Sequence, residues 1–281
     1  MATNAAQKLI QSPTHPSIVH SNLEPSENLR GKVLLLKDAT PLSSLQALTH
    51  NEAIHVVADT SPHVENEIRS ALLMLESPQT FFKDSLQTIL DPESILAGKN
   101  SQMKMNSISF NQSQQKKKVL AEMMGFATEL PVPESSLSDL YLVADELFTN
   151  AIYNAPFVRS GVRVDRSREI VLEHGFGATM AIGTYDEKLA LVCEDPYGSL
   201  KIPPLLKRVQ GCYETNARDM INWGRGGAGI GSFLVMECCT SLYWAVLESR
   251  KTVVGAVFPL GKGRHRRSKL PKCLHTLLMA R

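Results

Sequence analysis

The chain has 281 residues and a formal net charge of +2 at pH 7, with 43% apolar and 21% charged residues. This length can hold two modest domains, and this composition excludes a chain that is disordered throughout. No apolar run approaches the ~20 residues that span a bilayer, and the first residues lack the pattern of a secretion signal. We therefore expect a cytoplasmic protein that does not cross a membrane.

The cysteines indicate a reducing environment. Their number is odd, no Cys-x-x-Cys occurs, and the chain is large for a disulfide scaffold, so neither a disulfide framework nor a zinc site is expected. We expect free thiols. The five cysteines are Cys193, Cys212, Cys238, Cys239 and Cys273.

Residues 1–30 combine prolines and scattered polar residues without periodicity, which predicts a loosely ordered lead-in. Strand-like and helix-like segments then alternate, which predicts a small α/β unit with parallel strands over residues 31–100. Asp59 follows the second strand, as a receiver-like phosphoacceptor would, but the acidic cluster and later lysine of such a site are missing. The expected elements are strands at 32–37 and 53–58, helices at 41–50 and 64–76, and helix-prone sequence at 81–96.

A polar, helix-poor segment at 98–112 marks the expected junction with a second domain at 113–260. Helical periodicity predicts a helix at 114–130 and another at 229–238, whereas apolar runs between polar turns predict strands. The strands are expected at 170–174, 179–185, 189–194, 241–247 and 252–258, with the last two forming an antiparallel pair.

The most informative segment is Asp139–Asn154, which predicts an amphipathic helix with a capping-box signal that begins at Ser136. Glu146, Asn150 and Asn154 recur at intervals of four residues, about one helical turn, so they line one edge of that helix. A carboxylate beside carboxamides can orient a water and hold a hard cation through oxygen. A solvated polar face is the alternative for this helix considered by itself.

Two later segments strengthen the case for a ligand site. An apolar, strand-like run ends in Asp195, and a turn at Gly198 follows. Residues 224–231 read Gly-Arg-Gly-Gly-Ala-Gly-Ile-Gly, and five glycines that open onto a helix can bring backbone N–H groups close to an anion. This segment lacks the Gly-Lys-Ser/Thr ending of a Walker A loop, and alone it is equally typical of a flexible surface turn.

Taken in order, the three segments resemble the nucleotide-binding boxes of the GHKL ATPase superfamily. Glu146-Leu-Phe-Thr-Asn150-Ala resembles its N box. Asp195-Pro-Tyr-Gly198 resembles its G1 box, and residues 224–231 resemble its G2 box. The resemblance covers about residues 113–260 and is closest to the small serine kinases that act as anti-sigma factors. It implies an α+β fold, a two-layer α/β sandwich of the Bergerat ATP-binding type, preceded here by the small N-terminal α/β domain.

The resemblance also implies ATP and Mg²⁺ as cofactors and suggests roles for individual residues. Glu146 would be the base that activates the attacking hydroxyl or water, Asn150 would supply an oxygen to Mg²⁺, and Asp195 would accept the adenine amine. The glycine N–H groups would hold the phosphates. The remaining expected nucleotide contacts are Asn154, Gly198, Arg225, Gly226, Gly227, Gly229 and Gly231.

The chain departs from the family's pattern at three positions. Tyr197 and Ser199 stand where many members have glycine in the G1 box, which bears on the shape of the adenine pocket. Asn154 stands where the serine kinases often have histidine. That third departure bears on catalytic competence more than on binding.

We therefore expect an ATP-dependent regulatory protein, with serine/threonine phosphorylation favoured over histidine phosphorylation. It would phosphorylate or sequester a partner such as a sigma factor, an anti-anti-sigma factor or a phosphoacceptor protein. Two alternatives stay open, namely the catalytic part of a histidine-kinase-like phosphorelay and a non-catalytic nucleotide sensor. A homodimer also stays open.

Two more segments bear on function, one before the expected G2 box and one at the end of the chain. Residues 199–223 lie where this superfamily carries a mobile lid, and their prolines and cations predict a segment with little packing of its own. The tail at 261–281 has seven Lys or Arg and no acid, which indicates a solvated basic arm. No aromatic residue interleaves these charges, so nucleic-acid binding is not expected.

Overall fold

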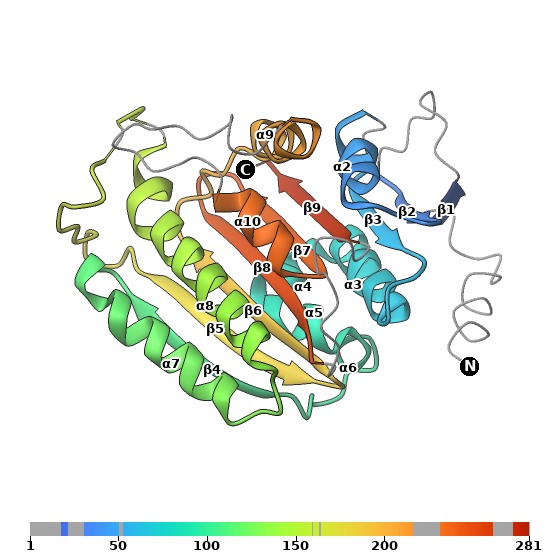
Figure 1. Cartoon of the computed structure of the whole chain (residues 1–281), viewed down its shortest axis with the longest axis horizontal. Coiled ribbons are helices and arrows are strands. Elements are labelled where there is room, and N and C mark those ends of the chain that lie inside the picture. Colours follow the sequence, from blue (N-terminus) through green and yellow to red (C-terminus); the bar gives the residue numbers. More distant parts are fainter. Residues whose placement is uncertain are drawn as a thin grey trace.

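The chain folds around one mixed β-sheet with helices on both faces (Figure 1). The computed structural model describes residues 18–21, 31–50, 53–158, 160–162, 164–215, 231–260 and 272–280. The nine strands within these ranges lie in the order β1-β2-β3-β9-β7-β8-β6-β5-β4. Among the helices in the same ranges, none has the length and apolar composition that spanning a bilayer requires.

One half of the sheet is antiparallel. Its β5–β6 hairpin turns through Asp186 and Glu187, whose φ angles of 47° and 61° suit the twist of a tight hairpin. The strands predicted at 179–185, 189–194, 241–247 and 252–258 are confirmed, and the last two pair antiparallel. In chain order the strands of this half are β4 (Lys104–Phe110), β5 (Ala178–Tyr185), β6 (Lys188–Asp195), β7 (Ser241–Leu247) and β8 (Lys251–Pro259).

In this half, one predicted strand is wrong and one strand was not predicted. Residues 170–174 form no strand, and Val171 makes only an isolated bridge with Gln112. Residues 98–112 were expected to be polar and poor in helix, and they contain an unpredicted strand, β4, which pairs with β5 along its whole length. Most side chains of β4 are polar or exposed, so a search for apolar runs does not find it. The proposed domain junction at this segment stays a prediction, because one sheet includes strands from both sides of it.

The other half of the sheet contains parallel strands and the end of the chain. β2 (Val33–Leu36) and β3 (His55–Ala58) pair in parallel, as the alternation of strand and helix predicted. β1 (Ile18–Ser21), inside the expected lead-in, adds a third parallel strand. β9 (Cys273–Met279) lies between β3 and β7, antiparallel to β3 and parallel to β7. The prediction of a solvated tail is therefore wrong for residues 272–280, where Lys272 and His275 are buried.

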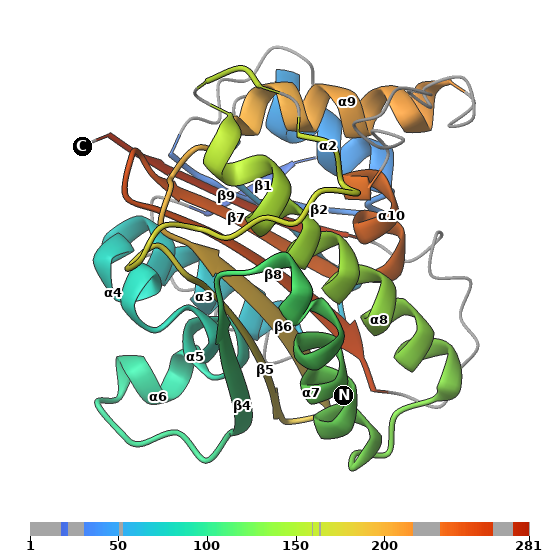
Figure 2. The same ribbon diagram turned by 90° about the vertical axis from the view of Figure 1, so that its left-hand side faces the viewer.

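Helices cover both faces of the sheet (Figure 2). The mixed α/β architecture agrees with the expected fold class, and the specific Bergerat arrangement of residues 113–260 stays a prediction. Successive side chains of a strand point to opposite faces. In β6, Leu189 and Leu191 pack under the first helical layer, whereas Ala190 and Val192 pack under the second. The first layer contains α2 (Pro41–His50), α7 (Lys116–Thr128), α8 (Glu134–Thr149), α9 (Ile202–Glu214) and α10 (Gly231–Cys238). The second contains α3 (Val64–Glu76), α4 (Pro78–Lys83), α5 (Ser85–Leu90) and α6 (Pro92–Leu96).

Most predicted helices are present, with two differences at their boundaries. The helix-prone sequence at 81–96 falls into the short helices α4, α5 and α6, each of the last two beginning just after an Asp. α8 begins at Glu134, after Pro133, so Ser136 lies in its first turn and is buried instead of capping the helix. The helices predicted at 41–50 and 64–76 match α2 and α3, and those at 114–130 and 229–238 correspond to α7 and α10.

A buried polar network joins the two halves of the sheet. The Glu67 carboxylate, on α3, accepts hydrogen bonds from Ser241 Oγ (2.6 Å) and Tyr243 OH (2.6 Å) on β7, and lies 3.0 Å from His275 Nε2 on β9. His275 Nδ1 lies 3.3 Å from Nδ1 of His55 on β3. Burial alone would raise the pKa of Glu67, but these hydrogen bonds hold it below its ordinary value. Because each of these side chains is buried, removing one of them leaves the others with polar groups that have neither water nor a hydrogen-bond partner.

We expect Glu67→Ala to lower the free energy of unfolding by about 3–5 kcal/mol, because the buried polar groups of His275, Ser241 and Tyr243 lose their shared hydrogen-bond partner. Glu65→Ala is the matched control on the same helix, since Glu65 makes only a partly exposed ion pair with Arg69 and should cost about 1 kcal/mol or less. Urea denaturation at pH 7 measures both. Equal effects of the two substitutions would show that the network does not hold the sheet together.

Candidate functional site

The three polar residues of the predicted helix edge form a connected row. α8 ends at Thr149 and continues as one turn of π-helix, Asn150–Asn154. Asn150 Nδ2 donates to Glu146 Oε1 (3.1 Å), and Asn154 Nδ2 donates to Asn150 Oδ1. π-turns interrupt α-helices most often at functional sites. The row is therefore organised by its own hydrogen bonds and is not simply a solvated polar face.

Packing on the opposite side of α8 holds this row in place. Phe148 and Leu147 are buried beneath the helix, and Phe148 stacks on Phe110 of β4 with ring centroids 4.6 Å apart. Lys116 at the start of α7 bonds Asp145 Oδ1 (2.6 Å), the residue next to Glu146. The helix cannot rotate without breaking these contacts, so Glu146 stays directed to one side.

The end of the glycine-rich segment lies directly against Glu146. A Cβ atom at Gly231 would overlap the Glu146 carboxylate, so a larger residue there would have to displace the Glu146 side chain. α10 begins at Gly231, and its first N–H groups have no helical partners. The expected phosphate contacts Arg225, Gly226, Gly227 and Gly229 lie outside the described residues.

The predicted adenine-binding turn follows β6. Asp195 Oδ1 accepts the Tyr197 backbone N–H (2.9 Å), which closes the turn on the carboxylate. Gly198 has φ of +55°, and a Cβ there would overlap the Leu247 carbonyl oxygen in the β7–β8 hairpin. Glycine is therefore required both by the backbone conformation and by the close approach.

Ser199 connects this turn to the end of the row on α8. Its hydroxyl donates to the backbone oxygen of Ala155 (2.8 Å), which begins the short helix Ala155–Phe157 after the π-turn. Tyr197, the other departure within the G1-like segment, stacks on Phe176 with ring centroids 5.9 Å apart. Both departures thus make structural contacts that a glycine could not make.

Burial perturbs both carboxylates of the site. Burial raises the pKa of Glu146, against the attraction of Arg166 and the hydrogen bond from Asn150. Burial also raises the pKa of Asp195 to about 6, although the backbone N–H groups of Tyr197 and Gly198 oppose it. Perturbed carboxylates are typical of functional sites but also occur in structural networks.

Arg166 is a residue that motif spacing did not find. It belongs to the loop between the π-turn and β5, where sequence reasoning expected only turns and a strand. Its charge acts on Glu146, and its Nε is buried without a hydrogen-bond partner among the described residues. A lone arginine in a loop carries no spacing signal, so only the fold places it here.

Asn150 offers the site a side-chain oxygen, the kind of ligand that hard cations take. Among the described residues, no group of three or more His, Cys, Asp or Glu side chains could hold a metal ion. Mg²⁺ needs only one or two protein oxygens because waters and phosphates complete its shell. The Asn150 side-chain oxygen, beside Glu146 and the glycine-lined approach at Gly231, fits that limited role.

The prediction that residues 199–223 form a poorly packed lid is wrong for residues 202–214. α9 covers that span, with Leu206 and Val209 on its buried side. Its two prolines stand in the first turn, where proline starts a helix instead of breaking one. Gln210 accepts a hydrogen bond from Thr49 of α2 (2.7 Å), and Tyr213 donates one to Glu237 of α10. Residues 216–223 lie outside the described residues.

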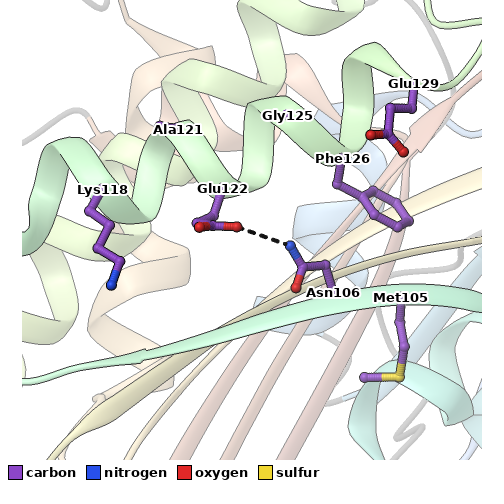
Figure 3. Close-up of a pocket in the computed structure, with 8 residues that line it drawn as sticks. All are labelled: Met105, Asn106, Lys118, Ala121, Glu122, Gly125, Phe126 and Glu129. Atoms are coloured by element: carbon purple, nitrogen blue, oxygen red, sulfur yellow. Dashed lines mark hydrogen bonds between the residues drawn. The ribbon is translucent and has the colours of Figure 1, made fainter.

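A cavity of about 540 Å³ lies elsewhere, between α7 and the edge strand β4 (Figure 3). Asn106 of β4 donates to Glu122 of α7 across it (3.4 Å). Lys118 and Glu129 lie toward its two ends. It contains none of the predicted site residues, so the predicted nucleotide site does not rest on this cavity.

Comparison with protein-family models gives no match for this chain, and comparison with curated proteins gives none either. The resemblance of the three segments therefore stays a hypothesis that rests on their residues and on the geometry described above.

We expect Gly198→Ala to lower the free energy of unfolding by roughly 1–3 kcal/mol or more, because it adds left-handed strain and a backbone clash at a buried turn. Gly125→Ala is the matched control. Gly125 lies within α7 with open space at its Cβ position, and alanine should stabilise by about 0.5–1 kcal/mol. Urea denaturation measures both, and a neutral Gly198→Ala would contradict the geometry of this turn.

Proposed function

We propose that the chain is an ATP-binding regulatory protein of the GHKL superfamily, of the anti-sigma-factor serine kinase type. It would bind Mg·ATP where α8, the turn after β6 and the start of α10 meet, and it would phosphorylate or sequester a partner protein. The observation that best supports this proposal is the contact between Glu146 and Gly231. That contact joins the N-box-like and G2-like segments, which are more than 70 residues apart in the chain.

The site residues would then divide the work as follows. Asp195 accepts the exocyclic amine of adenine at the end of β6. Asn150 offers its side-chain oxygen to Mg²⁺, and the N–H groups that begin α10 at Gly231 bind phosphate oxygens. Mg²⁺ supplies charge neutralisation at the phosphates during transfer. Glu146 takes the proton from the attacking hydroxyl, and burial assists it because a raised pKa makes a better base at neutral pH.

One observation favours a non-catalytic nucleotide switch as the second candidate. The Asn150 oxygen already accepts a hydrogen bond from Asn154, so a metal must share or displace it. A switch needs only nucleotide-dependent shape, whereas a kinase needs Glu146 free to move a proton. Phosphorylation of candidate partners separates the two. An acid-stable product would indicate Ser or Thr, and an acid-labile product would indicate the phosphorelay alternative.

We expect Glu146→Ala to keep nucleotide binding within about threefold and to lower turnover by roughly 10²–10⁴-fold, as for loss of a general base. Asn150→Ala should instead abolish Mg²⁺-dependent binding, because it removes a ligand from a site with few protein ligands. Fluorescent ATP-analogue binding and partner phosphorylation measure the two effects. Glu134→Gln, in the first turn of the same helix, is the control and should change neither. Normal turnover by Glu146→Ala would exclude Glu146 as the base.

Asp195 should make nucleotide binding depend on pH. Its pKa of about 6 means that it gains a proton as the pH falls from 7.5 to 5.5, and a protonated carboxyl is a weaker acceptor for the adenine amine. Affinity for a fluorescent ATP analogue should therefore fall across that range. Asp195→Asn should bind weakly and show a flatter pH dependence, with circular dichroism unchanged. Undiminished binding by this variant would exclude Asp195 as the adenine acceptor.

A further inference from the structure

The turn that carries Arg166 is held in shape by its own hydrogen bonds. The Asp165 side-chain oxygen Oδ1 accepts from the Ser167 backbone N–H (2.9 Å) and from the Ser167 hydroxyl (2.8 Å). The Arg168 N–H donates to the Asp165 backbone oxygen (3.0 Å). This is the geometry of an Asx turn, in which a short polar side chain replaces a backbone partner. Arg166 therefore starts from a defined backbone.

The same turn is tied to the candidate site. The Tyr153 hydroxyl, on the π-turn between Asn150 and Asn154, donates to the Arg168 backbone oxygen (3.1 Å). Just beyond it, the Ile170 N–H donates to the Ser113 hydroxyl (2.9 Å) ahead of α7. The C-terminal side of the turn is thus held against the π-turn and the segment that precedes α7. The position of a residue on this turn relative to the Glu146 carboxylate is therefore restrained.

Arg166 has a donor that the described protein does not satisfy. Its Nε is buried and has no hydrogen-bond partner among the described residues. The ion pairs within the described ranges do not include it, although its charge reaches Glu146 strongly enough to oppose the effect of burial on that group's pKa. Buried polar groups in native proteins nearly always have partners. Within the described residues, the buried Nε of Arg166 is therefore a donor that an anion at the proposed site could satisfy.

We propose that Arg166 binds the terminal phosphate of the nucleotide and so distinguishes ATP from ADP. A planar guanidinium can bind two phosphate oxygens at once. Gly231, the first residue of α10, lies against the same Glu146 carboxylate on which the Arg166 charge acts, so a phosphate bound there would meet donors from two elements. Arg225 is also expected to contact the nucleotide, so Arg166 would be a second arginine at its phosphates. The inference rests on the proposed nucleotide site and adds to it the group that reads the third phosphate.

The test compares a fluorescent non-hydrolysable ATP analogue with fluorescent ADP, both with Mg²⁺, on the full chain. Arg166→Ala should weaken binding of the ATP analogue by roughly 10–100-fold, as for one lost charge-assisted contact, and change ADP binding by about twofold or less. Arg166→Lys should recover part of the loss, because it restores charge without the planar fork. Arg168→Ala, in the same turn, is the control, since the turn uses its backbone atoms.

Each other outcome overturns the inference in a recognisable way. Equal loss of both nucleotides in Arg166→Ala and Arg166→Lys would make Arg166 structural. No loss of either would remove it from the site. Binding of inorganic phosphate that depends on Arg166, without discrimination between nucleotides, would assign it to free phosphate. A wild-type chain that binds neither nucleotide would overturn the proposed function itself. A wild-type chain that binds both nucleotides, with Arg166→Ala binding them equally well, would overturn only the role of Arg166.

Discussion

The insertion of β9 between β3 and β7 is the constraint on which the rest of the sheet depends. Without it, the parallel strands near the N-terminus and the antiparallel meander would have no shared strand in the described sheet. β9 brings His275 to Glu67, and Glu67 accepts hydrogen bonds from two residues of β7. The strand thus adds both backbone pairing and a buried polar network. A network of this kind favours one strand register, because any shift of β9 would leave its buried polar side chains without hydrogen-bond partners.

The meander that β9 completes is what positions the candidate site. β6 ends at Asp195, and β8 and the hairpin after β7 set the space around Gly198. α8 packs across this half of the sheet, with Phe148 against β4, so its opposite edge faces the start of α10. Two glycines mark where these elements approach closely. At Gly198 a Cβ atom would meet backbone atoms at a positive φ, which explains why glycine stands there, whereas at Gly231 it would displace the Glu146 carboxylate.

Elements with a strong apolar period could be predicted from the sequence, and elements defined by tertiary context could not. The spacing of Glu146, Asn150 and Asn154 predicted a row on one helical edge, and their hydrogen bonds confirm that arrangement. β4 was missed because it is a polar edge strand, and β9 because seven preceding or flanking cations dominated the tail's composition. Helical sequence was predicted where α3 to α6 lie, but the resemblance covers only residues 113–260, so it does not predict which face of the sheet these earlier helices cover.

The predicted lid and Arg166 are two further cases in which tertiary packing could not be predicted from the sequence. Prolines and cations suggested a loose segment at 199–223, but Leu206 and Val209 recur at helical spacing and bury one side of α9. Arg166 had no pattern at all, and only the folded loop places its charge near Glu146. Local composition therefore misjudged a segment that packs, and motif spacing overlooked a residue that acts across the fold.

Hydrogen–deuterium exchange with and without Mg·ATP tests the convergence of the three segments most directly. We expect slower exchange at residues 144–155, 195–200 and 224–235 together, with little change along the cavity between α7 and β4. A parallel sample of Asn150→Ala should lose that protection at all three segments. Unchanged exchange in the wild type, or protection confined to α7 and β4, would contradict a nucleotide site at Glu146, Asp195 and Gly231.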